Sequence, residues 1–171
     1  VSQSEESAAT KSVDILFRMK KLIQNNNYPT KKTLMLFEKI AESIKIREIP
    51  EDDSTVLLFD KEDYANCMRK YREIENDRPY IIENILADLA FMDDPNQGIW
   101  NNFFTLAIFY NILKLCIPAF LETGLNDRDL AVAVSYATKI VLNTHLADKG
   151  ILMSFMNNNS SDLPHAAFLI N

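Results

Sequence analysis

The sequence predicts an all-α protein, a single bundle-like domain of six or seven helices around a central apolar helix. Apolar residues recur with a period of about 3.6 in every long segment, which is the spacing of one helix face. Only three glycines occur in 171 residues, too few for the many tight turns of a sheet protein. The 47% share of hydrophobic residues suffices for a core that needs neither a disulfide nor a metal.

The helical domain is expected to cover residues 10–157. Residues 1–9 are polar and are expected to be disordered. Residues 158–171 are expected to form a carboxyl-terminal tail, after a stretch rich in asparagine and serine. The chain begins with Val1 rather than with an initiator methionine, which indicates a fragment or a processed protein.

Three helices are expected in the amino-terminal half. The first covers residues 10–24 and the second residues 31–47, where apolar side chains follow the spacing of one helix face. Asp60 precedes a third helix that ends near Ile74. The Asp60 carboxylate is placed to accept hydrogen bonds from the first free N–H groups of that helix.

Residues 48–59 separate the second and third predicted helices. Residues 48–55 are polar and are expected to form a loop. The apolar run 56–59 suits a strand by its β-branched and aromatic residues, but the sequence offers no recognisable partner strand. We therefore expect this run to be buried loop or the start of the next helix.

The carboxyl-terminal half is expected to hold the remaining helices. Pro79 suits the first turn of a fourth helix that ends at residue 92. Residues 99–121 form the most apolar segment, and polar residues inside it, such as Asn111, favour a buried central helix over a membrane span. Asn126 is expected to cap a sixth helix with a bend near residues 143–145, before a last helix that ends near residue 156.

Composition excludes several classes of function. A net charge of −6 gives the chain no overall attraction for nucleic acid. The two cysteines, Cys67 and Cys116, are far apart in sequence and lack metal-ligand spacing. Cys116 lies in a strongly apolar run and is expected to be a buried free thiol, a usage that suits a reducing compartment. Neither a signal peptide nor a membrane span is recognisable, and we expect a cytoplasmic protein.

The sequence contains no recognisable catalytic constellation. Neither His145 nor His165 has a serine, cysteine or aspartate at motif spacing. A glycine-rich phosphate loop is absent too, so catalytic and cofactor-binding residues stay unassigned and no metal site is expected in this chain. The aromatic residues between 100 and 110 are expected either to pack in the core or to line a pocket between helices.

One polar set stands out on the predicted fourth helix. Tyr80, Glu83 and Asn84 occupy positions i, i+3 and i+4, which share one side of a helix. Ile82 and Ile85 lie beside them, so at least part of the set is expected to be shielded from water, where a carboxylate needs a partner. The set is either a hydrogen-bonded clip between helices or a site for a cationic lysine side chain or the polar end of a cofactor.

Several segments of the chain follow the pattern of a known family. Residues 80–86 have the sequence Tyr-Ile-Ile-Glu-Asn-Ile-Leu, and the first predicted helix ends in Leu-Ile-Gln-Asn shortly before Tyr28. Together with the apolar helices at 34–44, 103–121 and 126–157, they resemble the carboxyl-terminal helical region of the flagellin lysine-N-methylases. That family has Tyr-Ile-Leu-Glu-Asn-Tyr-Leu in the first of these segments and Leu-Gln-Asn before a tyrosine in the second.

The resemblance covers residues 13–157 and implies a protein-lysine N-methyltransferase. Such an enzyme transfers methyl groups from S-adenosylmethionine to lysines of flagellin, the protein of the bacterial flagellum. Two departures matter. Residues 93–96 replace a loop rich in phenylalanine and proline, and the family's amino-terminal cysteine-rich segment, thought to hold a metal or iron–sulfur centre, is absent. The resemblance thus implies a carboxyl-terminal portion, inactive alone, whose partners are flagellin and that cysteine-rich part.

Two other classes of protein share these general features. An acidic all-α chain with an aromatic-lined core is also similar to the ligand-binding, dimerising half of a TetR-type transcriptional regulator. A helical protein-interaction domain is the third alternative. Upstream cysteine clusters in the intact gene product would favour the methylase, whereas an upstream helix-turn-helix would favour the regulator.

Overall fold

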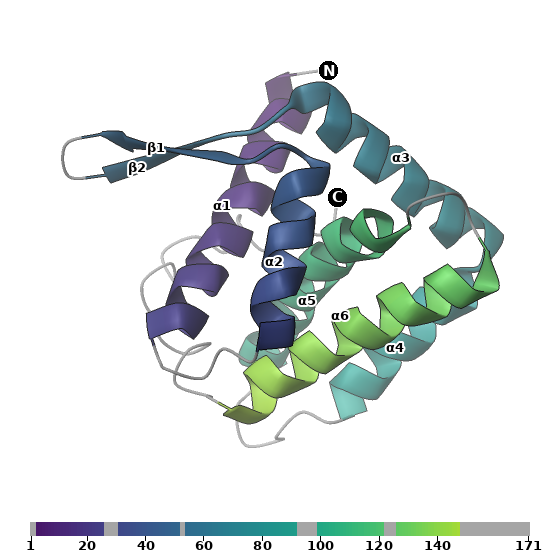
Figure 1. Cartoon of the computed structure of the whole chain (residues 1–171). Helices are drawn as coiled ribbons and strands as arrows, with labels where there is room; N and C mark the ends of the chain where they lie inside the picture. The colour runs from purple at the N-terminus through teal and green to yellow at the C-terminus, as the bar shows by residue number, and fades with distance from the viewer. Residues whose placement is uncertain (1–2, 26–30, 52–53, 92–98, 122–125, 148–171) are drawn as a thin grey trace.

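The computed structural model describes residues 3–25, 31–51, 54–91, 99–121 and 126–147. Within these residues the chain is helical apart from one small antiparallel sheet, which confirms the predicted all-α class (Figure 1). The elements in chain order are α1 (Gln3–Asn25), α2 (Lys31–Ser43), β1 (Arg47–Glu51), β2 (Ser54–Leu58), α3 (Lys61–Asp77), α4 (Pro79–Phe91), α5 (Ile99–Phe120) and α6 (Asp127–Ala147).

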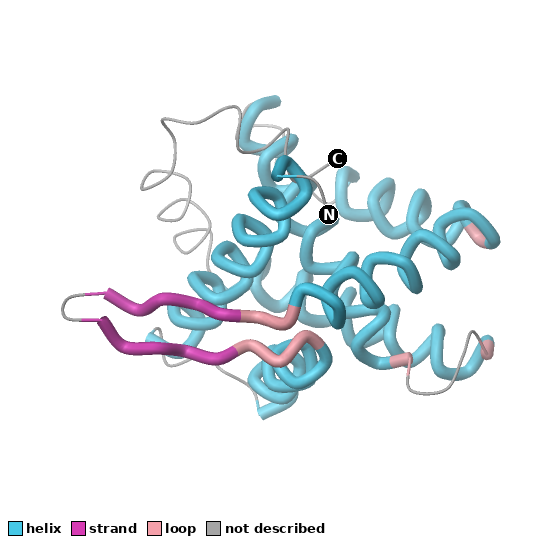
Figure 2. The backbone as a smooth tube through the Cα atoms, turned by 90° about the horizontal axis from the view of Figure 1, so that it is seen from above, coloured by secondary structure: helices cyan, strands magenta, loops and turns pink. Residues whose placement is uncertain are grey.

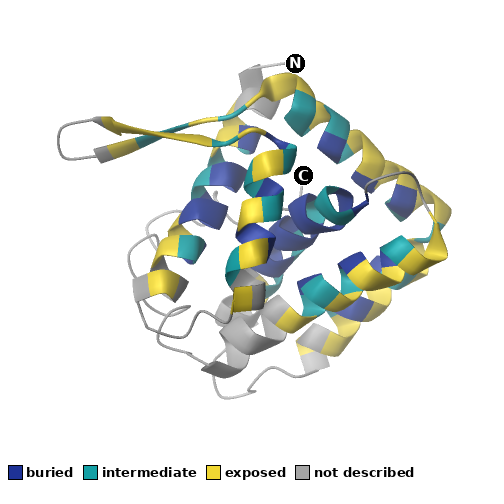
Figure 3. Cartoon of the chain, viewed as in Figure 1, coloured by how far each residue is buried: buried dark blue, intermediate teal, exposed yellow. Residues whose placement is uncertain are grey.

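The central position predicted for the most apolar segment is confirmed. Helix α5 packs against each of the other five described helices. The visible part of α5 in Figure 3 is mostly buried, and in its second half buried side chains cover most of the circumference. Removing this apolar surface from water is the main favourable contribution to folding. The largest of its fully buried side chains are Ile108, Phe109, Ile112, Leu113 and Leu115.

The helices around α5 each bury one face. Helix α1 contributes Val13 and Met19, α2 contributes Phe37 and Ile40, and α3 contributes Tyr71, all with almost no exposed surface. These positions follow the helical period that the sequence displays. The pattern of apolar residues therefore determines which side of each helix meets the core.

Helices α1 and α6 both differ from the sequence prediction. Helix α1 begins at Gln3, so residues 3–9 are helical rather than disordered, and Ala9 is buried against the body. Helix α6 continues without a break to Ala147, so the bend predicted at residues 143–145 is wrong. The predicted last helix, the tail at 158–171 and His165 lie outside the described residues.

Helix α2 ends at Ser43, four positions before the predicted end. The amide of Ile46 donates to the carbonyl of Ala41 at 2.8 Å, and the amide of Lys45 donates to the carbonyl of Glu42 at 3.3 Å. This paired arrangement is a Schellman cap, whose key residue adopts the left-handed conformation. That residue is Lys45, with a φ of 51°. The cap turns the chain out of the helix and directs it into β1.

The hairpin of β1 and β2 is the main departure from the predicted fold. Residues 48–55 were expected to be a loop and residues 56–59 a buried loop or helix start, but β2 pairs antiparallel with β1 from Arg47↔Leu58 to Glu51↔Ser54. The prediction failed because β1 has little strand propensity: its five residues include a proline and three charged side chains. Only the tertiary structure reveals it as the partner of β2.

Three predicted helix starts are confirmed. The Asp60 carboxylate accepts hydrogen bonds from the amides of Glu62 and Asp63, at 2.9 and 3.0 Å. These bonds lower the pKa of Asp60, because they stabilise the charged carboxylate. Pro79 is the first residue of α4. Asn126 accepts a hydrogen bond from the amide of Asp129 at 2.8 Å and so caps α6.

Candidate functional site: two grooves beside α4

Helix α4 lies at the surface and packs against α3 and α5. Ile82 and Ile85 form its buried face. The helix begins directly after Arg78, the residue that caps the carboxyl end of α3, so the two helices meet at a sharp corner. Because only one side of α4 is covered, its remaining side chains are available to line surface depressions.

The structure separates the three polar residues that the sequence grouped on this helix. Tyr80, Glu83 and Asn84 are all exposed, and Tyr80 retains 57% of its accessible surface. The predicted shielding from water is therefore wrong. The reason is that no neighbouring helix packs directly over these three side chains, which a helical pattern alone does not disclose. Tyr80 and Glu83 line two different grooves, and Asn84 is not among the described lining residues of either.

The first depression, here called the α4–α5 groove, has a volume of about 350 Å³. Its walls are mainly apolar, with aromatic side chains from α5 on one side. Two carboxylates, those of Glu75 and Glu83, are its only charged groups among the described lining residues. The described residues that line it are Glu75, Pro79, Ile82, Glu83, Leu86, Phe103, Leu106, Ala107 and Tyr110.

A hydrogen bond joins α3 to α5 at the floor of this groove. The Tyr110 hydroxyl donates to Oε1 of Glu75 at 2.8 Å. Tyr71 supports the Tyr110 ring from the core in an edge-on contact, with 6.0 Å between the ring centroids. Burial, together with the neighbouring Glu75, raises the pKa of Tyr110 to about 12, so its phenol stays protonated as a donor at neutral pH.

Lys114 adds a cation beside this cluster. Its Nζ lies 4.5 Å from the centroid of the Tyr110 ring, a distance at which the ring face attracts a positive charge. Burial lowers the pKa of Lys114, and the nearby Glu75 carboxylate acts in the opposite direction. The contact with Lys114 demonstrates that the Tyr110 ring accommodates an ammonium group.

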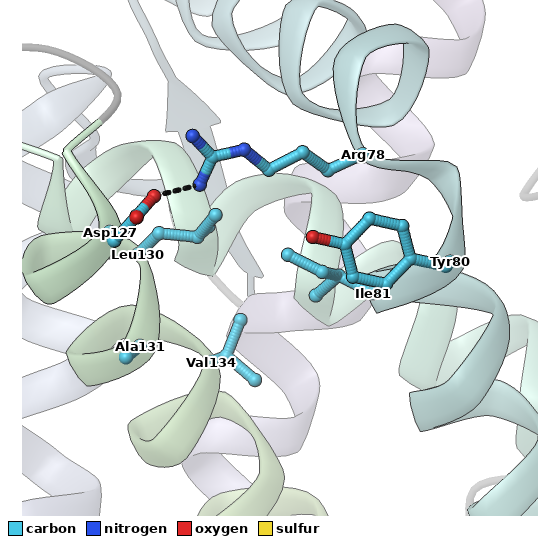
Figure 4. Close-up of a pocket in the computed structure, with 7 residues that line it drawn as sticks. All are labelled: Arg78, Tyr80, Ile81, Asp127, Leu130, Ala131 and Val134. Carbon is cyan, nitrogen blue, oxygen red and sulfur yellow. Dashed lines mark hydrogen bonds and ion pairs between the residues drawn. The ribbon is translucent and has the colours of Figure 1, made fainter.

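The second depression, the α4–α6 groove, has a volume of about 520 Å³ (Figure 4). Arg78 and Asp127 form an ion pair at one end of it, and Asp127 raises the pKa of the Arg78 guanidinium. Figure 4 shows Tyr80 and Ile81 of α4 facing α6 across the groove. The α6 side is lined by Leu130, Ala131 and Val134.

The two grooves differ in their charged groups. Arg78 and Asp127 pair with each other in the α4–α6 groove, whereas in the α4–α5 groove Glu75 accepts a hydrogen bond from Tyr110 and lies near Lys114, and Glu83 is exposed. Both partners of the Arg78–Asp127 pair belong to this chain and neutralise one another. The α4–α5 groove instead presents two negative charges without a cation among its described lining residues. The α4–α5 groove is therefore the stronger candidate for binding a charged ligand, and that ligand would be a cation.

The cysteines are not candidates for chemistry. Cys67 and Cys116 are both free and buried, which confirms the prediction for Cys116. Burial raises the pKa of Cys67 to about 12 and also raises that of Cys116, which keeps both as unreactive thiols. The described residues contain no group of three or more side chains suited to hold a metal ion. Nor does any described helix have the length and apolar character to cross a membrane.

Sequence reasoning identified Glu83 but missed Glu75. The two belong to different helices, and the hydrogen bond of Glu75 reaches a tyrosine 35 positions away in the chain. The sequence around a single glutamate on a polar helix does not indicate that its carboxylate accepts a hydrogen bond from another helix. The aromatic residues between 100 and 110 were expected either to pack in the core or to line a pocket. Phe109 is in the core, whereas Phe103 and Tyr110 line the groove.

No protein-family model, curated protein or solved structure matches this chain. The similarity to the flagellin lysine-N-methylases thus stays a prediction that rests on the residues quoted above.

Proposed function

We propose that this chain is the carboxyl-terminal helical part of a protein-lysine N-methyltransferase that acts on flagellin, and that its α4–α5 groove holds a lysine side chain of the substrate. Two observations support the proposal. The segment 80–86 that resembles the methylases is the one that forms α4. The groove beside it combines apolar walls with the carboxylates of Glu75 and Glu83, and this combination carries the proposal.

The chemistry of lysine matches both properties of the groove. Its four-carbon stem gains by covering apolar surface such as Leu86 and Leu106, while its ammonium group stays at the polar rim. The carboxylate of Glu83 attracts the ammonium directly. The exposed aromatic ring of Phe103 adds cation–π attraction. A neutral or anionic ligand would bring no counter-charge to the exposed carboxylate of Glu83.

The groove would serve recognition rather than methyl transfer. A lysine amine must lose its proton before its lone pair can attack a methyl group, and neighbouring carboxylates favour the charged ammonium instead. We therefore assign the groove to a lysine that anchors flagellin. Catalytic residues stay unassigned in this chain.

The cofactors of the proposed enzyme do not fit the described residues. S-adenosylmethionine is expected by resemblance, and so is an iron–sulfur or other metal centre in a cysteine-rich amino-terminal part. The described part of the chain has no glycine-rich loop and no cluster of metal ligands. The proposal assigns both groups to that other part, which would be the second partner besides flagellin. A cytoplasmic location accords with two buried free thiols.

Glu83→Gln tests the groove directly, because the exchange removes the charge and preserves the shape. The 171-residue chain would be titrated by NMR with a flagellin peptide that contains one lysine. We expect shifts at groove residues, and binding weaker by roughly three- to tenfold in the variant, as for loss of one ion pair. Asp88→Asn is the matched control, since Asp88 is exposed on the same helix but does not line the groove.

A second peptide separates recognition of charge from non-specific apolar contact. Norleucine in place of the lysine keeps the aliphatic stem and lacks the ammonium group. Equal binding of the two peptides, or equal binding by the variant and the wild type, would refute the groove assignment.

Transfer of labelled methyl groups to flagellin by the intact protein tests the enzyme assignment. We expect Glu83→Gln to raise KM and leave kcat nearly unchanged. The 171-residue chain alone is expected to transfer none. An intact protein that never methylates flagellin would disprove the family assignment, whatever the peptide titration gives.

A further inference from the structure

The α4–α6 groove has a charged end and apolar walls. Arg78 and Asp127 form the charged end, where the guanidinium donates from Nη1 to Oδ1 of Asp127. Ile81 of α4 and Leu130 and Val134 of α6 line the walls (Figure 4). A concave surface that combines apolar side chains with a few polar groups at one place is the usual form of a small-molecule site.

The charged end of the groove is open to solvent. Arg78 lies between α3 and α4, and Asp127 is the first residue of α6. This corner is on the opposite side of the helical body from the β1–β2 hairpin, which therefore does not cover it (Figures 1 and 2). The side chains of Arg78 and Asp127 retain 25% and 86% of their accessible surface. A ligand can therefore reach both charged groups.

The ion pair leaves hydrogen-bonding capacity on both partners. Nη1 of Arg78 has two N–H groups, and Oδ1 of Asp127 occupies only one of them. Oδ2 of Asp127 accepts no hydrogen bond from the described residues. The hydroxyl of Tyr80, a side chain that is 57% exposed, adds a third polar group to the groove. The groove thus offers a cationic donor, an anionic acceptor and a neutral phenol.

The opposite charges of this pair determine the kind of ligand that fits. An anion is attracted by Arg78 and repelled by Asp127, and the reverse holds for a cation. A zwitterion with adjacent charges avoids this conflict, because its carboxylate can lie beside Arg78 and its ammonium beside Asp127. Four charges of alternating sign then lie together, and each has opposite charges as its nearest neighbours. Hydrogen bonds between charged groups are stronger than those between neutral ones.

We propose that the α4–α6 groove binds a free α-amino acid with a large apolar side chain. The ligand carboxylate accepts hydrogen bonds from Arg78 and from the hydroxyl of Tyr80, and the ligand ammonium donates to Oδ2 of Asp127. The ligand side chain covers apolar surface such as Ile81 and Leu130. The groove volume of about 520 Å³ is within the range of roughly 300–1,000 Å³ that is usual for ligand pockets.

The need for adjacent charges selects a free amino acid over a peptide. In an α-amino acid the ammonium and the carboxylate are attached to one carbon atom, so both are within reach of a single ion pair. In a peptide the two groups belong to different residues. The inference is independent of the proposed enzyme function, because the described lining residues of the two grooves do not overlap.

A titration of the 171-residue chain with amino acids and analogues tests the chemistry of the site. We expect L-leucine or L-phenylalanine to cause saturable NMR shifts at residues of the groove. Leucinamide lacks the carboxylate, N-acetylleucine lacks the ammonium, and glycine lacks the side chain. Each should bind roughly tenfold more weakly than leucine, or less. The proposal is overturned if neither amino acid binds, or if any of the three analogues binds as well as leucine.

Variants test whether the ligand lies in this groove. Ala131 is an exposed lining residue, so Ala131→Phe should fill the groove and abolish binding without disturbing the core. Val132→Phe is the matched control, because Val132 is also exposed on α6 but is not among the described lining residues. Equal binding by these two variants, with circular dichroism spectra like that of the wild type, would place the ligand elsewhere and overturn the proposal.

A charge variant provides a test that does not depend on filling the groove. Arg78→Gln should weaken binding of leucine by roughly tenfold and leave binding of leucinamide unchanged, since the amide has no carboxylate to lose. Arg128→Gln, at an exposed arginine that is not among the described lining residues, should bind leucine like the wild type. An Arg78→Gln protein with the wild-type affinity for leucine would contradict the assigned role of the guanidinium.

Discussion

The helical body and the hairpin differ in how far their side chains are covered by the rest of the chain. In the body, Asn111 of α5 is 1% exposed and donates from Nδ2 to the carbonyl of Ser12 in α1 at 3.2 Å. In the hairpin, apolar Ile49 and Leu58 face water while the backbone pairs only with itself. The buried side chains of the body have their contacts within the chain, so changes there should affect stability. The hairpin packs mainly against itself, so changes there should affect stability less.

The largest effect is expected for Asn111→Ala, which removes a buried side chain and its hydrogen bond to the carbonyl of Ser12 in α1. We expect the free energy of unfolding to fall by about 1–3 kcal/mol, measured by denaturant titration. Asn84→Ala is the matched control, because the same side chain is exposed on α4, and its effect should stay within about 0.5 kcal/mol. Similar losses of unfolding free energy in the two variants would contradict the distinction between the buried Asn111 and the exposed Asn84.

A smaller effect is expected for Tyr110→Phe, which removes the hydroxyl bonded to Glu75. The loss should be about 0.5–1.5 kcal/mol at neutral pH. The same residue predicts sensitivity to alkali. Its pKa is raised from near 10 to about 12 in the folded state, so the unfolded chain releases this proton first. Stability is then fully present below pH 10 and declines as the pH rises from about 10 to 12.

Thermal melting between pH 8 and 12 would measure this decline. The decline should be shallower in Tyr110→Phe, although Tyr71, whose pKa burial also raises, still contributes. A Tyr110→Phe protein with the wild-type slope would show that Tyr110 ionises as easily in the folded as in the unfolded state.

The smallest effect is expected at the junction between body and hairpin. Lys45 has a positive φ, which glycine adopts without the steric cost of a Cβ atom. Lys45→Gly should raise the melting temperature by roughly 1–3 °C, as in other left-handed helix caps. Lys45→Ala separates the backbone effect from the ion pair that Lys45 forms with Asp63 at 2.7 Å, since alanine also loses that pair but keeps the Cβ atom. A glycine variant no more stable than the alanine variant would mean that the cap is not strained.

The sequence by itself determined the helices and their buried faces. The reason is that α-helices are local structures, in which the period of apolar residues and nearby capping groups specify the element. The apolar run of α5 predicted its central place. Asp60, Pro79 and Asn126 marked three helix starts, and Asp60 and Asn126 accept hydrogen bonds from amides of the first turn.

Only the tertiary structure decided the features that depend on distant or one-sided contacts. Strand β1 exists because β2 is beside it, since its own residues favour no strand. Tyr80, Glu83 and Asn84 are exposed because no helix packs directly over their side chains, although their spacing would suit a buried face equally well. The α4–α5 groove requires Glu75 and Tyr110 to meet across 35 residues. Such contacts depend on how the helices pack, and helical periodicity specifies the buried face of a helix but not its neighbours.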